Sequence, residues 1–445
     1  MALRKRTCRD EGSGVIDGND DISSLVRTLN QEWAIGNTMR VFSLNWRHTS
    51  FLVFLLAFLV RGAFILTQQD GFYFPDSLVY SQTAVSLLSV GEFGANYDRA
   101  PAYPVFLAAV YWLFGESILA IRVVESFMGA FLAIVMTALG RRVGGEIVGI
   151  LAGIMWAVYP MGIFIAGLVY PTGLAVMLLA CGVWCMLPAR QEELSGKGVF
   201  LGGVFLGLAA LTIPVALLTI IVAAAWVFYW ARQSRLFLAL LLFLGAGVTI
   251  VPWTARDFLV HRQLVPVESS FKRYLPQIVT TETRLQDNGV NPILLRLELY
   301  AVHFGRNFVE FWELYPSRIQ MSDQGYRNKL HAKDSQIVKE TIYSPNQLIN
   351  AVSILSVGPI FLCALLGTVA MWLRRDRWRE LSLLWVMVLS FAVGYAVFVG
   401  KIRYRVPVEP YLIILSAYGV HAAYAVISAR FKSVAVPSGS IHRST

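Results

Sequence analysis

Long apolar stretches recur along the chain from Phe51 onward, and short polar clusters separate them. Each stretch has about 15 to 25 residues, which is enough for a helix to cross or nearly cross the hydrocarbon core of a bilayer. The pattern therefore predicts an all-α polytopic membrane protein with about ten transmembrane helices. The predicted spans are 47–67, 118–140, 146–165, 170–187, 198–212, 214–231, 235–254, 349–373, 380–399 and 408–429.

Proline residues divide two of the longest apolar stretches. Pro160 and Pro171 lie in "AVYPMGIFIAGLVYPTG", and Pro214 lies in "AALTIPVALL". A proline removes a helical hydrogen bond and clashes with the preceding turn, so we expect paired shorter helices at these places. With the N-terminus inside, this division puts five segments that each carry Lys or Arg on the cytoplasmic side, as the positive-inside rule requires. Those segments are "GRRVGGE", "ARQEELSGK", "ARQSR", "LRRDRWRE" and the tail "ARFKS".

Composition supports a membrane protein and narrows its chemistry. Of the 445 residues, 56% are hydrophobic and 15% are charged, which is too apolar for an ordinary soluble protein. The net charge of +10 is explained by the cytoplasmic excess of Lys and Arg, so nucleic acid is not an expected partner. Cys181 and Cys185 share a helix face without a nearby His or carboxylate. No cofactor is indicated, and a divalent metal ion has no support in the sequence.

The predicted topology divides the chain into five parts. They are a flexible cytoplasmic tail at 1–46, an N-terminal transmembrane catalytic module at 47–255 that includes an external loop at 68–117, an external and mainly helical segment at 256–347, C-terminal transmembrane helices at 348–430, and a cytoplasmic tail at 431–445.

The short external loop "GKIRYRVPVEPYLI" breaks the charge rule that the cytoplasmic loops obey. Lys401, Arg403 and Arg405 fall within five residues of one another there. One explanation is that they reach lipid phosphates at the outer interface. The other is a pocket for an anionic ligand, because clustered Arg and Lys side chains can grip a phosphate.

The external loop 68–117 contains the best candidate for an acid. Asp76 follows Pro75 at a natural cap position and begins "SLVYSQTAVSLLSVG", which has the spacing of a helix lying along the membrane surface. Asp76 is therefore either a helix cap or a functional carboxylate. The next stretch, "PAYPVFLAAVYWLFG", is short and aromatic and predicts a second interfacial helix.

Further ionisable groups lie near the same membrane level. Arg61 and Arg122 stand near the outer ends of the first two spans, and Glu125 follows Arg122 at a spacing that also suits a simple ion pair. The central parts of the spans carry no Asp, Glu, Lys or Arg, which counts against an ion-coupled transporter. The candidates for the substrate pocket are Tyr80, Tyr103, Tyr404 and Glu125.

Four stretches together resemble the GT-C superfamily of membrane glycosyltransferases, near bacterial protein O-mannosyltransferases and lipid A aminoarabinose transferases. "FPDSLVYSQTAVSLLSVGEFG" is similar to the first external loop of that superfamily, and "APAYPVFLAAVYWLFGESILAIRVV" to its second interfacial helix. "VPWTARDFLVHRQLVPV" resembles the exit into the large external segment, and "KIRYRVPVEPYLIILSAYG" the phosphate-side loop and last span. The resemblance covers about residues 47–430.

This resemblance implies transfer of a sugar from a polyprenyl-phosphate donor to an acceptor hydroxyl on an envelope glycan, lipid or protein. It also implies a bacterial inner membrane protein with both termini cytoplasmic and the active site facing the periplasm. Asp76 would be the general base. Arg403 and Arg405 would hold the donor phosphate, with Lys401, Arg61 and Arg122 as further candidates. The alternatives are a flippase or transporter of lipid-linked sugars and a non-catalytic membrane subunit.

The chain departs from the superfamily pattern at two places. Asp76 is followed by Ser77 where many relatives have a second acid. The turns "LVYPTGL" and "LTIPVAL" lack the acid and the arginine that relatives often carry there. The resemblance therefore leaves open which residues contact the acceptor.

Overall fold

The computed structural model describes residues 45–93, 99–189, 192–262, 265–268, 292–315, 347–398, 400 and 402–435. Within these ranges the chain forms helices and no strand. Contacts divide the chain into a main unit, Ser43–His421, and a second unit made of Met1–Phe42 and Ala422–Thr445. The fold and the site described below belong to the main unit.

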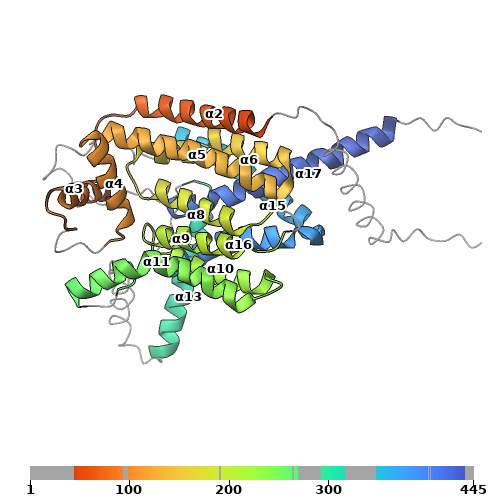
Figure 1. Ribbon diagram of the computed structural model, residues 1–445. Coiled ribbons are helices and arrows are strands. Elements are labelled where there is room, and N and C mark those ends of the chain that lie inside the picture. Colours follow the sequence, from red (N-terminus) through yellow and green to blue (C-terminus); the bar gives the residue numbers. More distant parts are fainter. Residues whose placement is uncertain are drawn as a thin grey trace, which may run out of the picture. The chain divides into compact units, whose positions relative to one another are not determined.

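Figure 1 shows the order of the helices along the chain. The helices of the N-terminal half are α2 (Trp46–Leu66), α3 (Pro75–Ser89), α4 (Ala102–Phe114), α5 (Ile118–Gly144), α6 (Glu146–Val158), α7 (Pro160–Phe164), η1 (Ile165–Gly167), α8 (Thr172–Met186), α9 (Gly196–Ala210), α10 (Ala216–Trp230) and α11 (Arg235–His261). The later helices are α13 (Pro292–Phe311), α15 (Gln347–Leu373), η4 (Arg375–Arg377), α16 (Trp378–Phe398), η5 (Ile402–Tyr404), η6 (Val406–Val408) and α17 (Glu409–Ala435).

A helix occupies each of the ten predicted spans, and the all-α membrane fold is confirmed. Six of these helices are long and apolar enough to cross a membrane singly, and α6 with α7 and η1 forms a pair bent by 55° that could make a seventh crossing. The helices α8, α9 and α10 have 15 residues each, which is short for an independent span. The number of crossings therefore stays a prediction.

The helix breaks expected at the prolines are present. The helix α6 ends at Val158 and α7 begins at Pro160, while α8 begins directly after Pro171. The helix α9 ends at Ala210, and α10 starts only after Pro214. Each break follows from the missing N–H group of proline and from its clash with the preceding turn.

Glycine allows the helices α9 and α11 to pack backbone against backbone. A Cβ atom on Gly203 would overlap the carbonyl group of Leu242, and one on Gly245 would overlap the carbonyl oxygen of Phe200. Small residues at such contacts let transmembrane helices approach closely enough for extensive van der Waals contact. The helices α9 and α11 therefore form a closely packed pair within the bundle.

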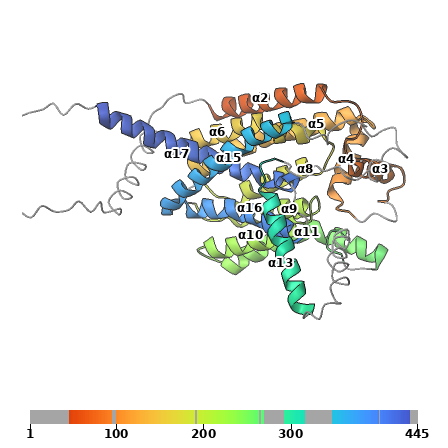
Figure 2. The ribbon, with the colours of Figure 1, turned by 180° about the vertical axis from the view of Figure 1, so that it is seen from behind.

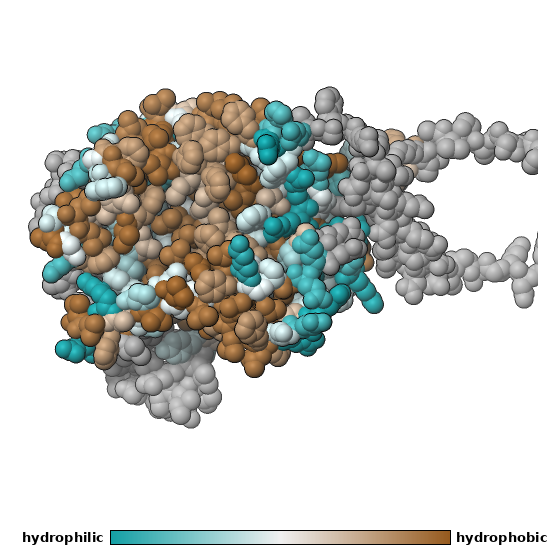
Figure 3. Space-filling view, in the orientation of Figure 1, coloured by the Kyte–Doolittle hydropathy of each residue, from teal (hydrophilic) through white to brown (hydrophobic). Residues whose placement is uncertain are grey.

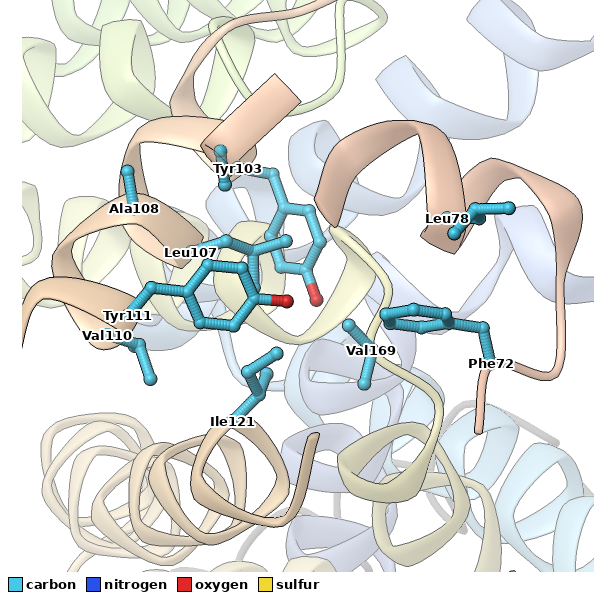
Figure 4. Packing of buried hydrophobic residues seen from close by; sticks show 10 residues of the cluster. Phe72, Leu78, Tyr103, Leu107, Ala108, Val110, Tyr111, Ile121 and Val169 are labelled. Carbon is cyan, nitrogen blue, oxygen red and sulfur yellow. The ribbon is translucent and has the colours of Figure 1, made fainter. Parts of the chain in front are cut away.

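The helices α3 and α4 lie together at one end of the bundle, beyond the end of α2 and the beginning of α5, as Figures 1 and 2 show. We call this the α3–α4 end. Tyr103 and Leu107 of α4 are fully buried with Leu78 of α3, and the cluster extends to Ile121 of α5 and to Val169 (Figure 4). Both helices were predicted from the sequence.

The surface of the bundle is largely apolar. Figure 3 shows hydrophobic side chains across most of the middle of one face, with hydrophilic side chains gathered mostly toward the end opposite α3 and α4. Large side chains such as Phe51 of α2 and Leu244 of α11 are 60% and 58% exposed. Such a belt suits contact with lipid, and the chain is a multi-pass membrane protein.

Candidate active site

Asp76 lies in the first turn of α3, and Pro75 occupies the entry to that helix. The N-cap residue is Phe74, and no side chain caps the helix, so of the two alternatives for Asp76 the helix cap is wrong. The Asp76 carboxylate instead contacts two other segments. Its Oδ1 atom lies 2.9 Å from Nη2 of Arg99, and its Oδ2 atom accepts a hydrogen bond of 3.3 Å from the hydroxyl of Tyr170. The side chain remains 34% exposed, so a ligand can reach the carboxylate.

Arg99 and Tyr80 form the side of the site nearest α4. The Arg99 guanidinium lies 5.4 Å from the centre of the Tyr80 ring, which meets the Tyr170 ring edge to face at 6.3 Å. Burial raises the pKa of the Tyr80 hydroxyl to about 12, against the opposing effect of Arg99. The hydroxyl therefore keeps its proton at neutral pH, and Tyr80 can act as a wall or a hydrogen-bond donor but not as a base.

Arg403 approaches the same tyrosine from the C-terminal half of the chain. It lies in η5, is exposed, and places its guanidinium 6.0 Å from the centre of the Tyr170 ring. Its Nη2 atom donates to the hydroxyl of Tyr404 at 3.0 Å. The Tyr404 ring in turn stacks on Tyr395 of α16 at 4.3 Å. Tyr170 thus contacts both Asp76 and Arg403.

Arg405 lies only two residues from Arg403 but has different surroundings. It is fully buried, and its Nε atom lies 3.1 Å from Oε1 of Glu409 in the first turn of α17. Its Nη1 atom donates to the carbonyl oxygens of Phe311 at 3.1 Å and Glu313 at 2.6 Å. The side chain is therefore engaged with protein groups. Lys401, the third cation predicted to bind phosphate, lies outside the described residues.

The two arginines near the outer ends of the first spans hold main-chain carbonyls. Arg61 is fully buried and donates to the carbonyl oxygens of Ala57, Trp156 and Ala157. These bonds fasten α2 to the end of α6. Arg122 is 2% exposed and donates to the carbonyl oxygens of Gln69, Gly71 and Gly167. It joins the loop before α3 to the segment that carries Tyr170.

Tyr103 and Glu125 lie behind the site. The Tyr103 hydroxyl donates to Oε1 of Glu125 at 2.7 Å, and both side chains are buried. The Tyr103 ring meets the Tyr80 ring edge to face at 5.4 Å. In Figure 4 the Tyr103 side chain extends from α4 into the space between α3 and Val169. The ring of Tyr103 therefore supports the ring of Tyr80. Of the two charged residues predicted near this level of α5, Glu125 accepts a hydrogen bond from Tyr103, whereas Arg122 donates to main-chain carbonyl groups.

Sequence reasoning missed three residues that the structure brings to this place: Arg99, Tyr170 and Glu268. The Glu268 Oε2 atom accepts a hydrogen bond of 3.2 Å from the main-chain N–H of Ala100, and its charge acts on the Tyr80 hydroxyl. Arg99 carried a signal, because a cation in a predicted external loop departs from the charge rule. Tyr170 and Glu268 carried none, since neither belongs to a motif or a charge cluster.

The convergent groups are a carboxylate, two guanidinium groups and several tyrosine hydroxyls. Guanidinium groups bind phosphate, while an ionised carboxylate accepts a hydrogen bond from a hydroxyl group. Within the part of the chain that the structure describes, no cluster of three or more His, Cys, Asp or Glu side chains could hold a metal ion. The arrangement suits a phosphate-containing ligand beside a hydroxyl group.

Residues 98–255 match the protein family described as dolichyl-phosphate-mannose-protein mannosyltransferase. The matched range includes Arg99 and Tyr170, whereas Asp76 and Arg403 lie outside it. No curated protein sequence matches the chain.

Several solved structures have a similar fold. The apo oligosaccharyltransferase of Archaeoglobus fulgidus gives a TM-score of 0.56 at 14% identity, over 88% of this chain and 52% of that one. The oligosaccharyltransferase AglB of the same organism, in complex with an inhibitory peptide and a dolichol-phosphate, gives 0.56 at 13% identity, over 91% and 53%. ArnT from Cupriavidus metallidurans bound to undecaprenyl phosphate gives 0.54 at 16% identity, over 88% and 64%.

The chain thus spans about half to just under two thirds of the proteins it resembles in structure. At identities of 13% to 16%, these matches show that the fold is shared, but they do not assign roles to individual residues. The sequence resemblance is confirmed at this level: the chain has the fold of the GT-C superfamily of membrane glycosyltransferases.

Proposed function

We propose that the protein transfers a sugar from a polyprenyl-phosphate donor to the hydroxyl group of an acceptor. The observation that carries the proposal is the position of Tyr170, which donates to the Asp76 carboxylate and lies beneath the Arg403 guanidinium. A base and a phosphate-binding cation thus meet from segments more than 300 residues apart in the chain. The fold supports the same activity, since two of the similar structures contain a dolichol-phosphate or undecaprenyl phosphate.

Asp76 is the general base in this proposal. Arg99 and Tyr170 keep its carboxylate oriented, and both oxygen atoms retain lone pairs for an acceptor hydroxyl. As the acceptor oxygen bonds to the anomeric carbon of the sugar, its proton passes to Asp76. A neutral hydroxyl is a poor nucleophile, so a positioned base typically contributes about 10²- to 10⁴-fold in rate.

Arg403 stabilises the leaving group. The bond between the anomeric carbon and the phosphate oxygen breaks, and its electron pair leaves with the polyprenyl phosphate. The phosphate group changes from a diester with one negative charge to a monoester with a further negative charge. An exposed guanidinium beside that oxygen is placed to offset the new charge. Lys401, two residues earlier in the chain, stays a candidate for the same role.

The aromatic side chains form the walls of the proposed pocket. Tyr170 contacts Tyr80 and Tyr404 contacts Arg403, while Tyr103, which bonds to Glu125, packs against Tyr80. For the buried arginines we propose indirect roles, since Arg61, Arg122 and Arg405 donate to protein carbonyl groups. Asp76 is followed by Ser77, and Glu268 is a candidate for a second acid, because its charge acts on the same Tyr80 hydroxyl as that of Asp76.

The site is proposed to face the periplasm of a bacterial inner membrane. Its support is the distribution of charge: the last turn of α5 and the segments after α8, α10 and α15, at the end opposite α3 and α4 in Figure 1, carry arginines. Both termini would then be cytoplasmic. The acceptor is proposed to be an envelope glycan, lipid or protein.

The test is a deletion strain complemented with the parent gene or with a variant, followed by mass spectrometry of the cell-envelope glycans. We expect the deletion strain to lack one sugar, and Asp76→Asn to leave that sugar missing while the protein accumulates normally. Asp70→Asn is the matched control, because it neutralises an exposed carboxylate in the same loop. An unchanged glycan profile in the deletion strain would overturn the transferase proposal. Restoration of the sugar by Asp76→Asn would overturn the role of Asp76 alone.

A further inference from the structure

The helix α13 is packed against the loop that carries Arg403. In Figures 1 and 2 this helix runs across the bundle rather than along it, and it contacts α16. The loop begins where α16 ends at Phe398 and continues through η5 and η6 to Glu409 at the start of α17. Three contacts join α13 to this loop and to the end of α16. They are made by Asn307, Gly400 and Arg405.

The first contact fixes the end of α16. Asn307 of α13 is 4% exposed, and its Nδ2 atom donates to the carbonyl oxygen of Ala396 at 3.1 Å. The same atom lies 2.8 Å from Nε2 of His303, and that ring nitrogen lies 3.2 Å from the carbonyl oxygen of Phe398. Carbonyl groups in the last turn of a helix have no partner within the helix. Asn307 and His303 approach two of these carbonyls, and the bond from Asn307 ties α13 to the last turn of α16.

The second contact is between two backbones. Gly400 is buried, and a Cβ atom at this position would overlap the main chain of Asn307 and lie 2.6 Å from its carbonyl carbon. Only glycine lets the loop pass so close to α13. By contrast, Gly305 on the same helix is exposed and has no atom within 4 Å of where its Cβ would be.

The third contact lies on the other side of Arg403. Arg405 donates to the carbonyl oxygens of Phe311, the last residue of α13, and of Glu313 just beyond it. A guanidinium at the C-terminal end of a helix satisfies carbonyl groups and offsets the helix dipole. Glu409 holds the other side of the Arg405 guanidinium at 3.1 Å. The loop is therefore anchored at residue 400 and at residue 405, while Arg403 between them is exposed.

We propose that α13 positions Arg403 for the phosphate of the lipid ligand, through Asn307 and Gly400 on one side and Arg405 on the other. This inference rests on the proposed function, because it takes Arg403 as the phosphate-binding group. An exposed side chain on an unsupported loop would sample many orientations, and binding would have to order it. Because both flanks of Arg403 are anchored on one helix, less conformational entropy is lost when the ligand binds.

The experiment compares the binding of undecaprenyl phosphate and of undecaprenol, the uncharged alcohol, to the full-length protein in detergent. Gly400→Ala and Asn307→Ala should each weaken binding of the phosphate by about tenfold or more, since a displacement of about 1 Å has large effects at such sites. Binding of undecaprenol should change little. Gly305→Ala, on the same helix, should leave both affinities as in the parent.

The comparison separates positioning from a loss of folding, because a disrupted bundle would bind both lipids poorly. Asn307→Ala adds no atoms, so it tests the inference even if Gly400→Ala fails to fold. If Arg403→Ala weakens phosphate binding while Gly400→Ala and Asn307→Ala bind like the parent, the positioning role of α13 is wrong and the proposed function stands. If the parent itself binds undecaprenyl phosphate no better than undecaprenol, the phosphate site is wrong, and the proposed function fails with it.

Discussion

Nη2 of Arg99 lies 2.9 Å from Oδ1 of Asp76, and this ion pair joins the first turn of α3 to the segment that enters α4. Both side chains are partly exposed, at 22% and 34%, so the pair borders a space that solvent and a ligand can enter. The pair fixes the direction of the carboxylate. The guanidinium of Arg99 also lies 5.4 Å from the centre of the Tyr80 ring.

The ion pair predicts that Arg99→Ala lowers turnover by about tenfold or more, because the freed carboxylate no longer faces the acceptor in one orientation. Arg99→Lys should retain part of the activity, since it keeps the charge but loses the planar fork. Sugar transfer by the purified protein is the measurement. Arg232→Ala removes an 81% exposed arginine in another loop and is the control. Parent-like turnover in Arg99→Ala would rule out this role.

Tyr170→Phe separates the hydroxyl of Tyr170 from its ring. The substitution removes the 3.3 Å hydrogen bond to Asp76 and keeps the aromatic face beneath Arg403. A net loss of about 0.5 to 1.5 kcal/mol is usual for one such bond, so we expect turnover to fall about 2- to 10-fold with lipid-phosphate affinity unchanged. Tyr229→Phe, at a 71% exposed position, provides the comparison. A fall in affinity with unchanged turnover would contradict the assignment.

Arg403 and Arg405 should respond to truncation in different ways. Arg403→Ala removes an exposed cation, and we expect the affinity for undecaprenyl phosphate to fall by about 1.5 to 3 kcal/mol, or about 10- to 150-fold, with unchanged thermal stability. Arg405→Ala leaves Glu409 buried without its partner. Loss of one partner of a buried pair costs about 3 to 5 kcal/mol, so the temperature of unfolding should drop.

Binding and thermal unfolding measured on the same preparations decide between these outcomes. Arg403→Lys should recover little affinity if the phosphate is held by two parallel hydrogen bonds. If Arg403→Ala binds undecaprenyl phosphate like the parent, the phosphate site lies elsewhere in the pocket, and Arg99 and Lys401 are the next residues to change.

The proposed orientation predicts the labelling of single cysteines by an impermeant thiol reagent in intact cells. After replacement of the four native cysteines, Glu116→Cys at the α3–α4 end should react, whereas Arg232→Cys and Arg375→Cys should react only after permeabilisation. All three positions are exposed, so a lack of labelling cannot be due to burial of the residue inside the protein. Labelling of Arg375→Cys in intact cells would show that this loop is external, and the proposed orientation would be wrong.

The sequence by itself determined where the helices lie. Helical hydrogen bonds join residues four apart, and membrane spans need a long apolar run, so both can be predicted from local sequence. The breaks at Pro160, Pro171 and Pro214 and the interfacial helices α3 and α4 were predicted for the same reason. Asp76 also stood out, because it begins a predicted interfacial helix, and its role as a base came from the family resemblance. The cations around Arg403 stood out because they break the positive-inside rule.

The tertiary structure alone decided the surroundings of those groups. Asp76 pairs with Arg99 and accepts a bond from Tyr170, which are 23 and 94 residues away in the chain. Arg403 and Arg405 were equivalent in the sequence, yet one is exposed and the other is buried against Glu409 and the end of α13. Contacts between distant segments depend on how the helices pack, and local sequence carries no information about that packing.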